Sequence, residues 1–281
     1  MKKIAKFNLI GVIFLENKRG FSFKKYWGPD ELAPHVTFSR NGVHYCVYCG
    51  EESDTREHAP SKVFLQKPYP SDLPVLPACY KCNNGFSDDE LYVEVYIDSL
   101  KYLSGYSSCL REENNDRIKS NAAFWDAQYD LHKFYQGENI SINPKIERIL
   151  TKLAVCHMVY ELSDGYSTNN CCIQPKLVSY YFSFDMTKSE IDAFDEFVLM
   201  NDKQTPTIGS RVFDKVYVLE PALNNIDETE INKIRMIVMS WTNIQEQNYR
   251  YIAWLENDDT FHIKIVIHDF LYAEIIFDQS Q

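Results

Sequence analysis

The most regular pattern of apolar and polar positions lies in the second half of the chain. Between residues 143 and 165, apolar side chains recur at helical spacing, preceded by Asn143 and Pro144 and followed by Gly165. Asparagine caps the unpaired N–H groups of a first turn, proline suits the first helical position, and glycine commonly ends a helix. We therefore predict a helix that begins at Pro144. His157 falls on its apolar face, where we expect a hydrogen-bonded core histidine.

A second helix is predicted after Thr187, which has the spacing of a capping box with Glu190, ahead of apolar residues that continue at helical spacing to Val198. Runs rich in Val, Ile, Tyr and Phe, typical of strands, follow. These predicted strands cover residues 211–219, 234–241, 249–256, 261–268 and 270–277. The second half is therefore predicted to be an α+β domain, and its patterns indicate no particular chemistry.

The first half is less regular. Residues 7–15 form an apolar run behind a basic start, but the run is far shorter than the roughly 20 residues that cross a bilayer, and no small-residue cleavage site follows. We interpret it as a strand and expect no membrane association. Residues 50–78 are polar and rich in proline, which predicts a long irregular loop. A loop of that length in a compact domain usually has a functional or metal-based reason.

The composition is that of a globular protein, with 281 residues of which 45% are hydrophobic and 25% charged. These values exclude collagen-like, low-complexity and largely disordered proteins, and the length gives room for one large or two smaller hydrophobic cores. The net charge of −11 argues against nucleic-acid binding, because contacts to phosphate use Lys and Arg.

The charge is, however, unevenly distributed. Residues 1–45 hold eight basic and three acidic side chains, whereas residues 46–105 hold five and ten, and residues 106–281 hold 16 and 27. In the first segment, basic residues are interleaved with aromatic ones, which suits either the tracking of a phosphate backbone or a partly packed pair of strands. We therefore divide the chain into a basic N-terminal arm (1–45), a module (46–105) on which the arm is expected to pack, and a larger α+β domain (106–281).

Four of the eight cysteines form two C-x2-C pairs, Cys46 with Cys49 and Cys79 with Cys82. A two-residue spacing lets both thiolates of a pair bind one ion from a tight turn, and four thiolates complete the tetrahedral shell of structural zinc. We therefore predict a Zn²⁺ site. Because such a site requires reduced thiols, a cytoplasmic location is expected rather than a disulfide-bonded secreted protein.

Candidate catalytic residues lie around these pairs: the triplet Arg56, Glu57 and His58 stands between them, and Asn83 directly follows the last cysteine. In this combination the sequence resembles the HNH, or ββα-metal, endonucleases, and within them the four-cysteine, zinc-stapled branch of the endonuclease VII type. The resemblance covers about residues 44–95. It implies a treble-clef-like nuclease module that hydrolyses DNA phosphodiester bonds and leaves 5′-phosphate and 3′-hydroxyl ends.

The resemblance also implies a role for each residue. Glu57 and Asn83 would bind a catalytic Mg²⁺ or similar divalent ion, and His58 would be the general base. This chemistry is physically reasonable, because carboxylate and amide oxygens suit a hard cation, whereas imidazole titrates near neutral pH. Arg56 is a candidate contact to the substrate phosphate, with an exposed structural arginine as the alternative.

The sequence departs from the family pattern in two places. Many relatives have Asp where this chain has Glu57, and many have a final histidine on the closing helix where this chain has Leu91 and Tyr92. Asn84 is an alternative to Asn83 as the amide ligand, although its position fits less well. The acidic residues 88–90 are interpreted as the first turn of a helix, with Ser87 and Glu90 as a capping box, rather than as metal ligands.

Three functions remain open from the sequence. The first is a metal-dependent DNA endonuclease, of the kind found in anti-phage systems and mobile elements. The second is a zinc-stapled module that binds nucleic acid or protein without cleaving it, which the missing histidine and the acidic charge favour. In the third, residues 106–281 form a homo-oligomerisation or ligand-sensing unit that controls a nuclease.

Overall fold

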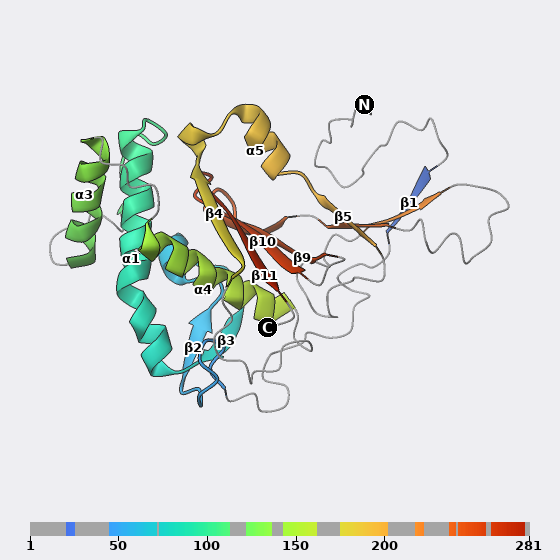
Figure 1. Ribbon diagram of the computed structural model, residues 1–281, viewed down its shortest axis with the longest axis horizontal. Coiled ribbons are helices and arrows are strands. Elements are labelled where there is room, and N and C mark those ends of the chain that lie inside the picture. Colours follow the sequence, from blue (N-terminus) through green and yellow to red (C-terminus); the bar gives the residue numbers. More distant parts are fainter. Residues whose placement is uncertain are drawn as a thin grey trace.

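The computed structural model (Figure 1) describes residues 21–25, 45–71, 73–112, 122–136, 143–161, 175–201, 217–221, 236–239, 241–256 and 260–278. Within these ranges the chain combines α-helices with antiparallel sheets. The predicted α+β class is therefore confirmed. None of the helices in the described ranges is long and apolar enough to span a membrane.

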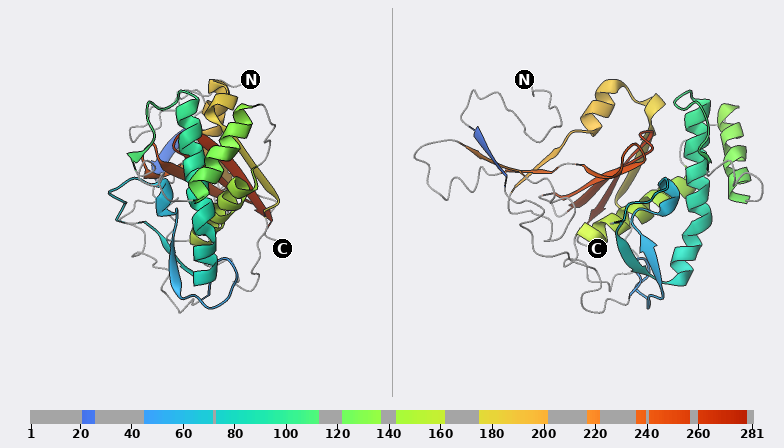
Figure 2. Two further views of the ribbon diagram at one scale, coloured as in Figure 1. Left: turned by 90° about the vertical axis from the view of Figure 1, so that its left-hand side faces the viewer. Right: turned by 180° about the vertical axis from the view of Figure 1, so that it is seen from behind.

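A long helix, α1 (Tyr80–Leu103), runs through the described part of the protein. Every residue from Tyr92 to Leu100 is buried, as expected for a helix that is covered on all sides. Helices α3 (Ala122–Tyr135) and α4 (Pro144–Glu161) pack against it. Figure 2 shows α4 crossing between α1 and the strands of the main sheet.

The main sheet has five antiparallel strands in the order β4-β11-β10-β9-β8. The strands are β4 (Leu177–Phe182), β8 (Thr242–Gln245), β9 (Tyr249–Leu255), β10 (Thr260–Ile267) and β11 (Leu271–Asp278). Helix α4 contacts four of them, and apolar side chains from the helix and the sheet form the core. The strands predicted at 249–256, 261–268 and 270–277 are confirmed.

A smaller sheet of four strands has the order β1-β6-β7-β5. Its strands are β1 (Phe21–Lys25), β5 (Val198–Asn201), β6 (Tyr217–Pro221) and β7 (Met236–Met239). Strand β1 belongs to the basic arm and pairs with β6. The strand predicted at 7–15 and most of the arm lie outside the described residues.

Strands β2 (Thr55–His58) and β3 (Val75–Ala78) pair antiparallel just before α1 begins. The prediction of an irregular loop over 50–78 is therefore wrong for these segments and for a short 3-10 helix, η1 (Lys62–Phe64). Proline suggested a loop because it donates no backbone hydrogen bond. Pro77 nevertheless lies in β3, where its carbonyl oxygen accepts a bond from the N–H of Val47 at 3.0 Å.

The helix starts show where local signals suffice. Asn143 caps α4 as predicted, since its Oδ1 accepts from the N–H of Lys145 at 3.0 Å. The capping box of Thr187 is also confirmed, but α5 (Lys188–Phe194) ends before Val198, which begins β5.

The predicted helix start at Ser87 is wrong. Helix α1 begins at Tyr80 with Cys79 as its N-cap, so Ser87 lies well inside the helix. Glu90 therefore cannot reach back to a free helix terminus, and its carboxylate contacts Ser61 and Lys152 instead.

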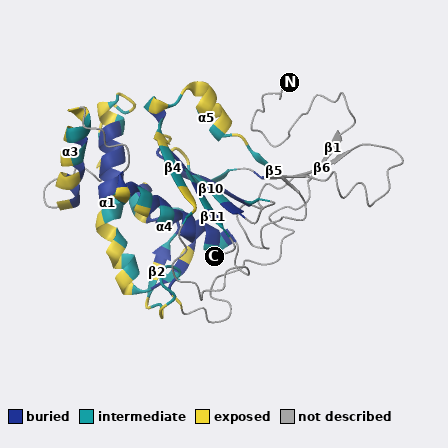
Figure 3. Cartoon of the chain, viewed as in Figure 1, coloured by how far each residue is buried: buried dark blue, intermediate teal, exposed yellow. Residues whose placement is uncertain are grey.

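One hydrophobic core joins the two halves of the chain. Phe64 and Tyr92, from the cysteine-containing module, share it with Ile149 of α4 and Ile263 of β10. Figure 3 shows the buried residues continuing from the middle of α1 through α4 into the main sheet. Side chains before and after residue 105 are therefore packed together.

Candidate functional site

The four paired cysteines meet at the N-terminal end of α1. Cys46 and Cys49 lie in a tight turn that Gly50 closes with a positive φ of 70° and a bond from its N–H to the carbonyl of Cys46 at 2.9 Å. Cys79 is the N-cap of α1 and Cys82 lies in its first turn. The turn and the helix start thus hold the two pairs against each other.

The sulfur positions suit one metal ion. All four Sγ atoms lie within 4.8 Å of one another, and those of Cys49 and Cys79 are 3.6 Å apart. A tetrahedral zinc with Zn–S bonds near 2.3 Å has sulfurs about 3.8 Å apart, whereas a disulfide has about 2.0 Å. The four thiols are free. The cluster could therefore hold a metal such as zinc.

The electrostatics of the cluster also favour a cation. Burial, followed by the neighbouring sulfurs of Cys49 and Cys79, raises the pKa of Cys82 well above its usual range. Four thiolates in one place repel one another, so a divalent cation is needed to stabilise them together.

Asn83 lies against strand β2. Its Nδ2 donates to the hydroxyl of Thr55 and to the carbonyl of Arg56, both at 3.2 Å. These two bonds fix the amide and leave Oδ1, the atom that would bind a metal, without a hydrogen bond among the described residues. Asn84 is exposed, so Asn83 is the amide that the fold brings to the strand carrying Glu57.

Glu57 is buried, with 5% of its surface exposed. Its Oε1 accepts from Nζ of Lys152 at 2.9 Å and from the hydroxyl of Ser61 at 3.5 Å. Within the described residues, Oε2 has no hydrogen bond. Burial raises the pKa of Glu57, and the adjacent Lys152 opposes that shift.

Lys152 of α4 is a site residue that the sequence did not reveal. It is 2% exposed and also pairs with Oε1 of Glu90, while Ser61 hydrogen-bonds to all three charged groups. We call Glu57, Ser61, Glu90 and Lys152 the acid–lysine cluster. The available signal was a lysine among the apolar positions of a predicted helix, which by itself is commonplace.

His58 follows Glu57 in β2 and is half-buried. Burial, then the charges of Lys62 and Lys152, lower the pKa of His58, which keeps the imidazole neutral and able to accept a proton near pH 7. Arg56 is exposed on the same strand. Adjacent residues of a strand point to opposite faces, so Arg56 and His58 share the face opposite that of Glu57.

Three α4 side chains connect this helix to the module. Arg148 pairs with Asp89 and donates to the carbonyl of Gly85 at 3.2 Å. One turn later Lys152 enters the acid–lysine cluster, and one turn after that the thiol of Cys156 lies 2.9 Å from the hydroxyl of Tyr48, in the cysteine turn. The helix is therefore fixed to both sides of the candidate site.

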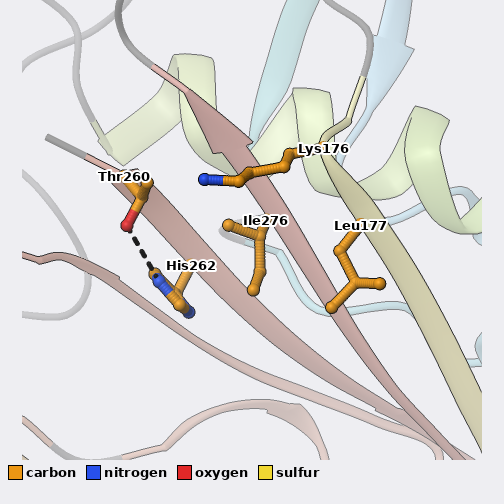
Figure 4. Close-up of a pocket in the computed structure, with 5 residues that line it drawn as sticks. All are labelled: Lys176, Leu177, Thr260, His262 and Ile276. Carbon is orange, nitrogen blue, oxygen red and sulfur yellow. Dashed lines mark hydrogen bonds between the residues drawn. The ribbon is translucent and has the colours of Figure 1, made fainter. Parts of the chain in front are cut away.

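Other polar groups lie away from this site. His157 is buried and its Nε2 is 2.7 Å from the hydroxyl of Tyr249, which confirms the prediction of a core histidine. A cavity on the main sheet is lined by residues of β4, β10 and β11 and by one adjoining lysine (Figure 4). Its lining residues are Lys176, Leu177, Thr260, His262 and Ile276, none of which belongs to the module.

Glu57 and Asn83 offer oxygen atoms that suit a second metal ion of the hard type. Glu57 and Asn83 each retain one oxygen without a hydrogen bond among the described residues, and both oxygens are of the kind that Mg²⁺ prefers. Lys152 is a competing cation at the same carboxylate.

Comparison of the chain with protein-family models, with curated proteins and with solved structures gives no match.

Proposed function

We propose that this protein is a metal-dependent HNH endonuclease that hydrolyses DNA phosphodiester bonds and carries structural zinc on its four paired cysteines. A cytoplasmic location agrees with the reduced thiols that such a zinc site needs. Defence against phage or a role in a mobile element would be its biological setting.

One observation carries the proposal. Two antiparallel strands lead directly into α1, and Asn83 at the start of that helix is hydrogen-bonded to the strand that carries Glu57 and His58. Asn83 and Glu57 thus lie on neighbouring elements close to the cysteine cluster, while His58 follows Glu57 on the opposite face of β2. The order of two antiparallel strands followed by a helix supports the proposal, because the resemblance to the ββα-metal endonucleases implies that order.

The residues divide the chemistry between them. Glu57 and Asn83 would hold the divalent ion, and His58 would take the proton from the attacking water. When bound, the ion supplies positive charge where the transition state becomes negative. Arg56 is exposed and available to contact a neighbouring phosphate. The soft thiolates and the hard oxygens select different metals.

The experiment compares two adjacent asparagines in a plasmid-nicking assay with the zinc-loaded protein and Mg²⁺ or Mn²⁺. We expect Asn83→Ala to reduce the nicking rate at least about 100-fold, because the ion loses a ligand. Asn84→Ala is the matched control, since Asn84 is exposed and next in sequence. Equal rates for the two variants would remove the basis for assigning Asn83.

The alternative is a zinc-stapled binding module without catalysis. The observation that favours it is the ion pair of Glu57 with Lys152, which gives the carboxylate a structural use. This alternative predicts DNA or protein binding that is unchanged by Mg²⁺, together with no nicking by the parent protein. A role of residues 106–281 in homo-oligomerisation would appear as a dimer in solution-scattering or sedimentation measurements.

A further inference from the structure

The acid–lysine cluster carries an excess of negative charge. Two carboxylates, Glu57 and Glu90, share the single ammonium of Lys152, so the three groups sum to one negative charge when all are ionised. Ser61 hydrogen-bonds to the charged groups but adds no charge. Buried charge is stable only when it is paired, so the cluster can accept a further cation.

The geometry shows where that cation has room. Every hydrogen bond that the carboxylates of Glu57 and Glu90 make among the described residues reaches Oε1, which faces Lys152. The Oε2 atoms make none. Lys152 therefore occupies one side of the carboxylates and leaves their other oxygens available.

Lys152 comes from outside the cysteine-containing module. It reaches the cluster because α4 is anchored on both sides of it, through Arg148 to Asp89 and through Cys156 to Tyr48. Its side chain is almost fully buried, so it is unable to contact DNA directly. Its influence must act through the carboxylates.

We propose that Lys152 is a positioning residue, a built-in counter-ion that holds Glu57 by one oxygen and sets the affinity of the site for its divalent ion. This inference rests on the proposed function, because it concerns the same ion. It gives residues 106–281 a part in the site: α4 supplies a charge that the module lacks.

Two substitutions test this by changing the cluster charge in opposite directions. Lys152→Met removes the competing cation with little change in side-chain length, so the affinity for a divalent ion should rise about tenfold or more. Glu90→Gln removes one negative charge and leaves Lys152 to Glu57 alone, so the affinity should fall about tenfold or more. A residue that only stabilised the fold would lower the affinity in both variants or in neither.

The neighbouring ion pair on the same two helices supplies matched controls. Arg148 lies one helical turn before Lys152 in α4, and its partner Asp89 directly precedes Glu90 in α1. The side chain of Arg148 is 49% exposed. Arg148→Met and Asp89→Asn repeat the two charge changes outside the cluster. Because solvent screens them, each should change the affinity less than about threefold.

The measurement is Mn²⁺ binding to the full-length, zinc-loaded protein, followed by the electron paramagnetic resonance signal of free Mn²⁺. Opposite shifts for Lys152→Met and Glu90→Gln, with both controls near the parent value, are the expected result. Shifts of the same sign, or values equal to the controls, overturn the inference. If Lys152→Met does not fold, Glu90→Gln decides alone: weaker binding supports the inference and unchanged binding overturns it.

Glu57→Gln separates this inference from the proposed function. If the parent binds Mn²⁺ and Glu57→Gln binds it equally well, the ion is not at Glu57, and both the site assignment and the inference fail. If Glu57→Gln abolishes binding but Lys152→Met and Glu90→Gln match their controls, the proposed metal site stands and the role of Lys152 is wrong. A parent that binds no Mn²⁺ contradicts both.

Discussion

Two carboxylates of α1, the partly buried Glu90 and the buried Glu94, stand one helical turn apart in different electrostatic surroundings. Glu94 is completely buried, and its two oxygens pair separately with Arg111 and His268. Glu90 and its neighbour Glu57 share one lysine. We call Glu94, Arg111 and His268 the arginine–histidine cluster. Both oxygens of Glu94 have partners, whereas Oε2 of Glu57 and Oε2 of Glu90 have no hydrogen bond within the part of the chain that the structure describes.

This difference separates a structural ion cluster from a candidate binding site on the same helix. A carboxylate whose two oxygens both have a side-chain partner has no oxygen left for a metal ion and serves to join elements, here α1 with the residues that follow β10 and with the segment after α1. Two carboxylates that share one cation keep such oxygens. The spare ligand oxygens, rather than burial, are the reason for proposing an ion site at Glu57.

Removing zinc should have the largest effect on stability. It should loosen the structure around the acid–lysine cluster and leave the structure around the arginine–histidine cluster intact. Structural zinc contributes roughly 10 kcal/mol to the folding of small zinc domains. The acid–lysine cluster is attached to the cysteine turn through Tyr48 and Cys156, while the arginine–histidine cluster lies among the core residues of α1. We expect chelation to increase hydrogen exchange over residues 45–58 and leave residues 92–100 protected. Equal exposure of both segments would show that the two regions unfold as one.

Breaking the arginine–histidine cluster should cost the most stability of any single substitution considered. Glu94→Gln leaves the buried guanidinium of Arg111 without its counter-charge, a change that costs about 3–5 kcal/mol in comparable buried pairs. Chemical denaturation measures this loss. Mn²⁺ affinity measured on the folded fraction should stay at the parent value, and a change there would mean that the two clusters are coupled.

The pH dependence of the unfolding free energy measures the contribution of the ionised Glu94 carboxylate without a large structural change. Although burial alone would raise it, His268 and Arg111 hold the pKa of Glu94 below its usual value. A lowered carboxyl pKa gives stability that is complete above the unfolded value, about 4.3, and is lost as the pH falls through the folded value. The difference in unfolding free energy between parent and Glu94→Gln should therefore shrink below about pH 4. A difference that stays constant down to pH 2 would contradict this account.

Glu57→Gln should have a smaller effect on stability and a larger one on ion binding. Lys152 keeps Glu90 as its partner, so the loss should be about 1–3 kcal/mol, the range for one buried polar interaction. Mn²⁺ binding should disappear, because the hard carboxylate ligand is gone. A stability loss as large as that of Glu94→Gln, with Mn²⁺ binding intact, would show that Glu57, like Glu94, stabilises the fold and does not bind the ion.

Arg148→Met should have the smallest effect. Its ion pair with Asp89 is half-exposed at the arginine, and exposed pairs contribute at most about 1 kcal/mol. Thermal unfolding of this variant should be close to that of the parent. A large loss would indicate that the attachment of α4 to α1 depends on Arg148 rather than on the shared core.

Local signals in the sequence predicted part of this structure. The C-x2-C spacing predicted the cysteine cluster, and the caps at Asn143 and Thr187 predicted two helix starts, because each depends on residues within one turn. Runs rich in Val, Ile, Tyr and Phe predicted β9, β10 and β11.

The remainder depends on contacts that no local pattern contains. Strands β2 and β3 lie in a proline-rich stretch, and the start of α1 was hidden because the helix begins at the second C-x2-C pair itself. Lys152 meets Glu57 from 95 residues away in the sequence, and His268 meets Glu94 from 174 residues away. Such pairings follow from the packing of α4 and the main sheet on α1.

Endonuclease activity is tested most directly by plasmid nicking with the zinc-loaded parent protein and with His58→Ala, each with and without Mg²⁺ or Mn²⁺. We expect the parent to nick DNA only when the divalent ion is present, and His58→Ala to do so at a rate at least about 100-fold lower, with unchanged zinc content. Cleavage by His58→Ala at the parental rate, or a parent that does not cut DNA with either ion, would contradict this expectation.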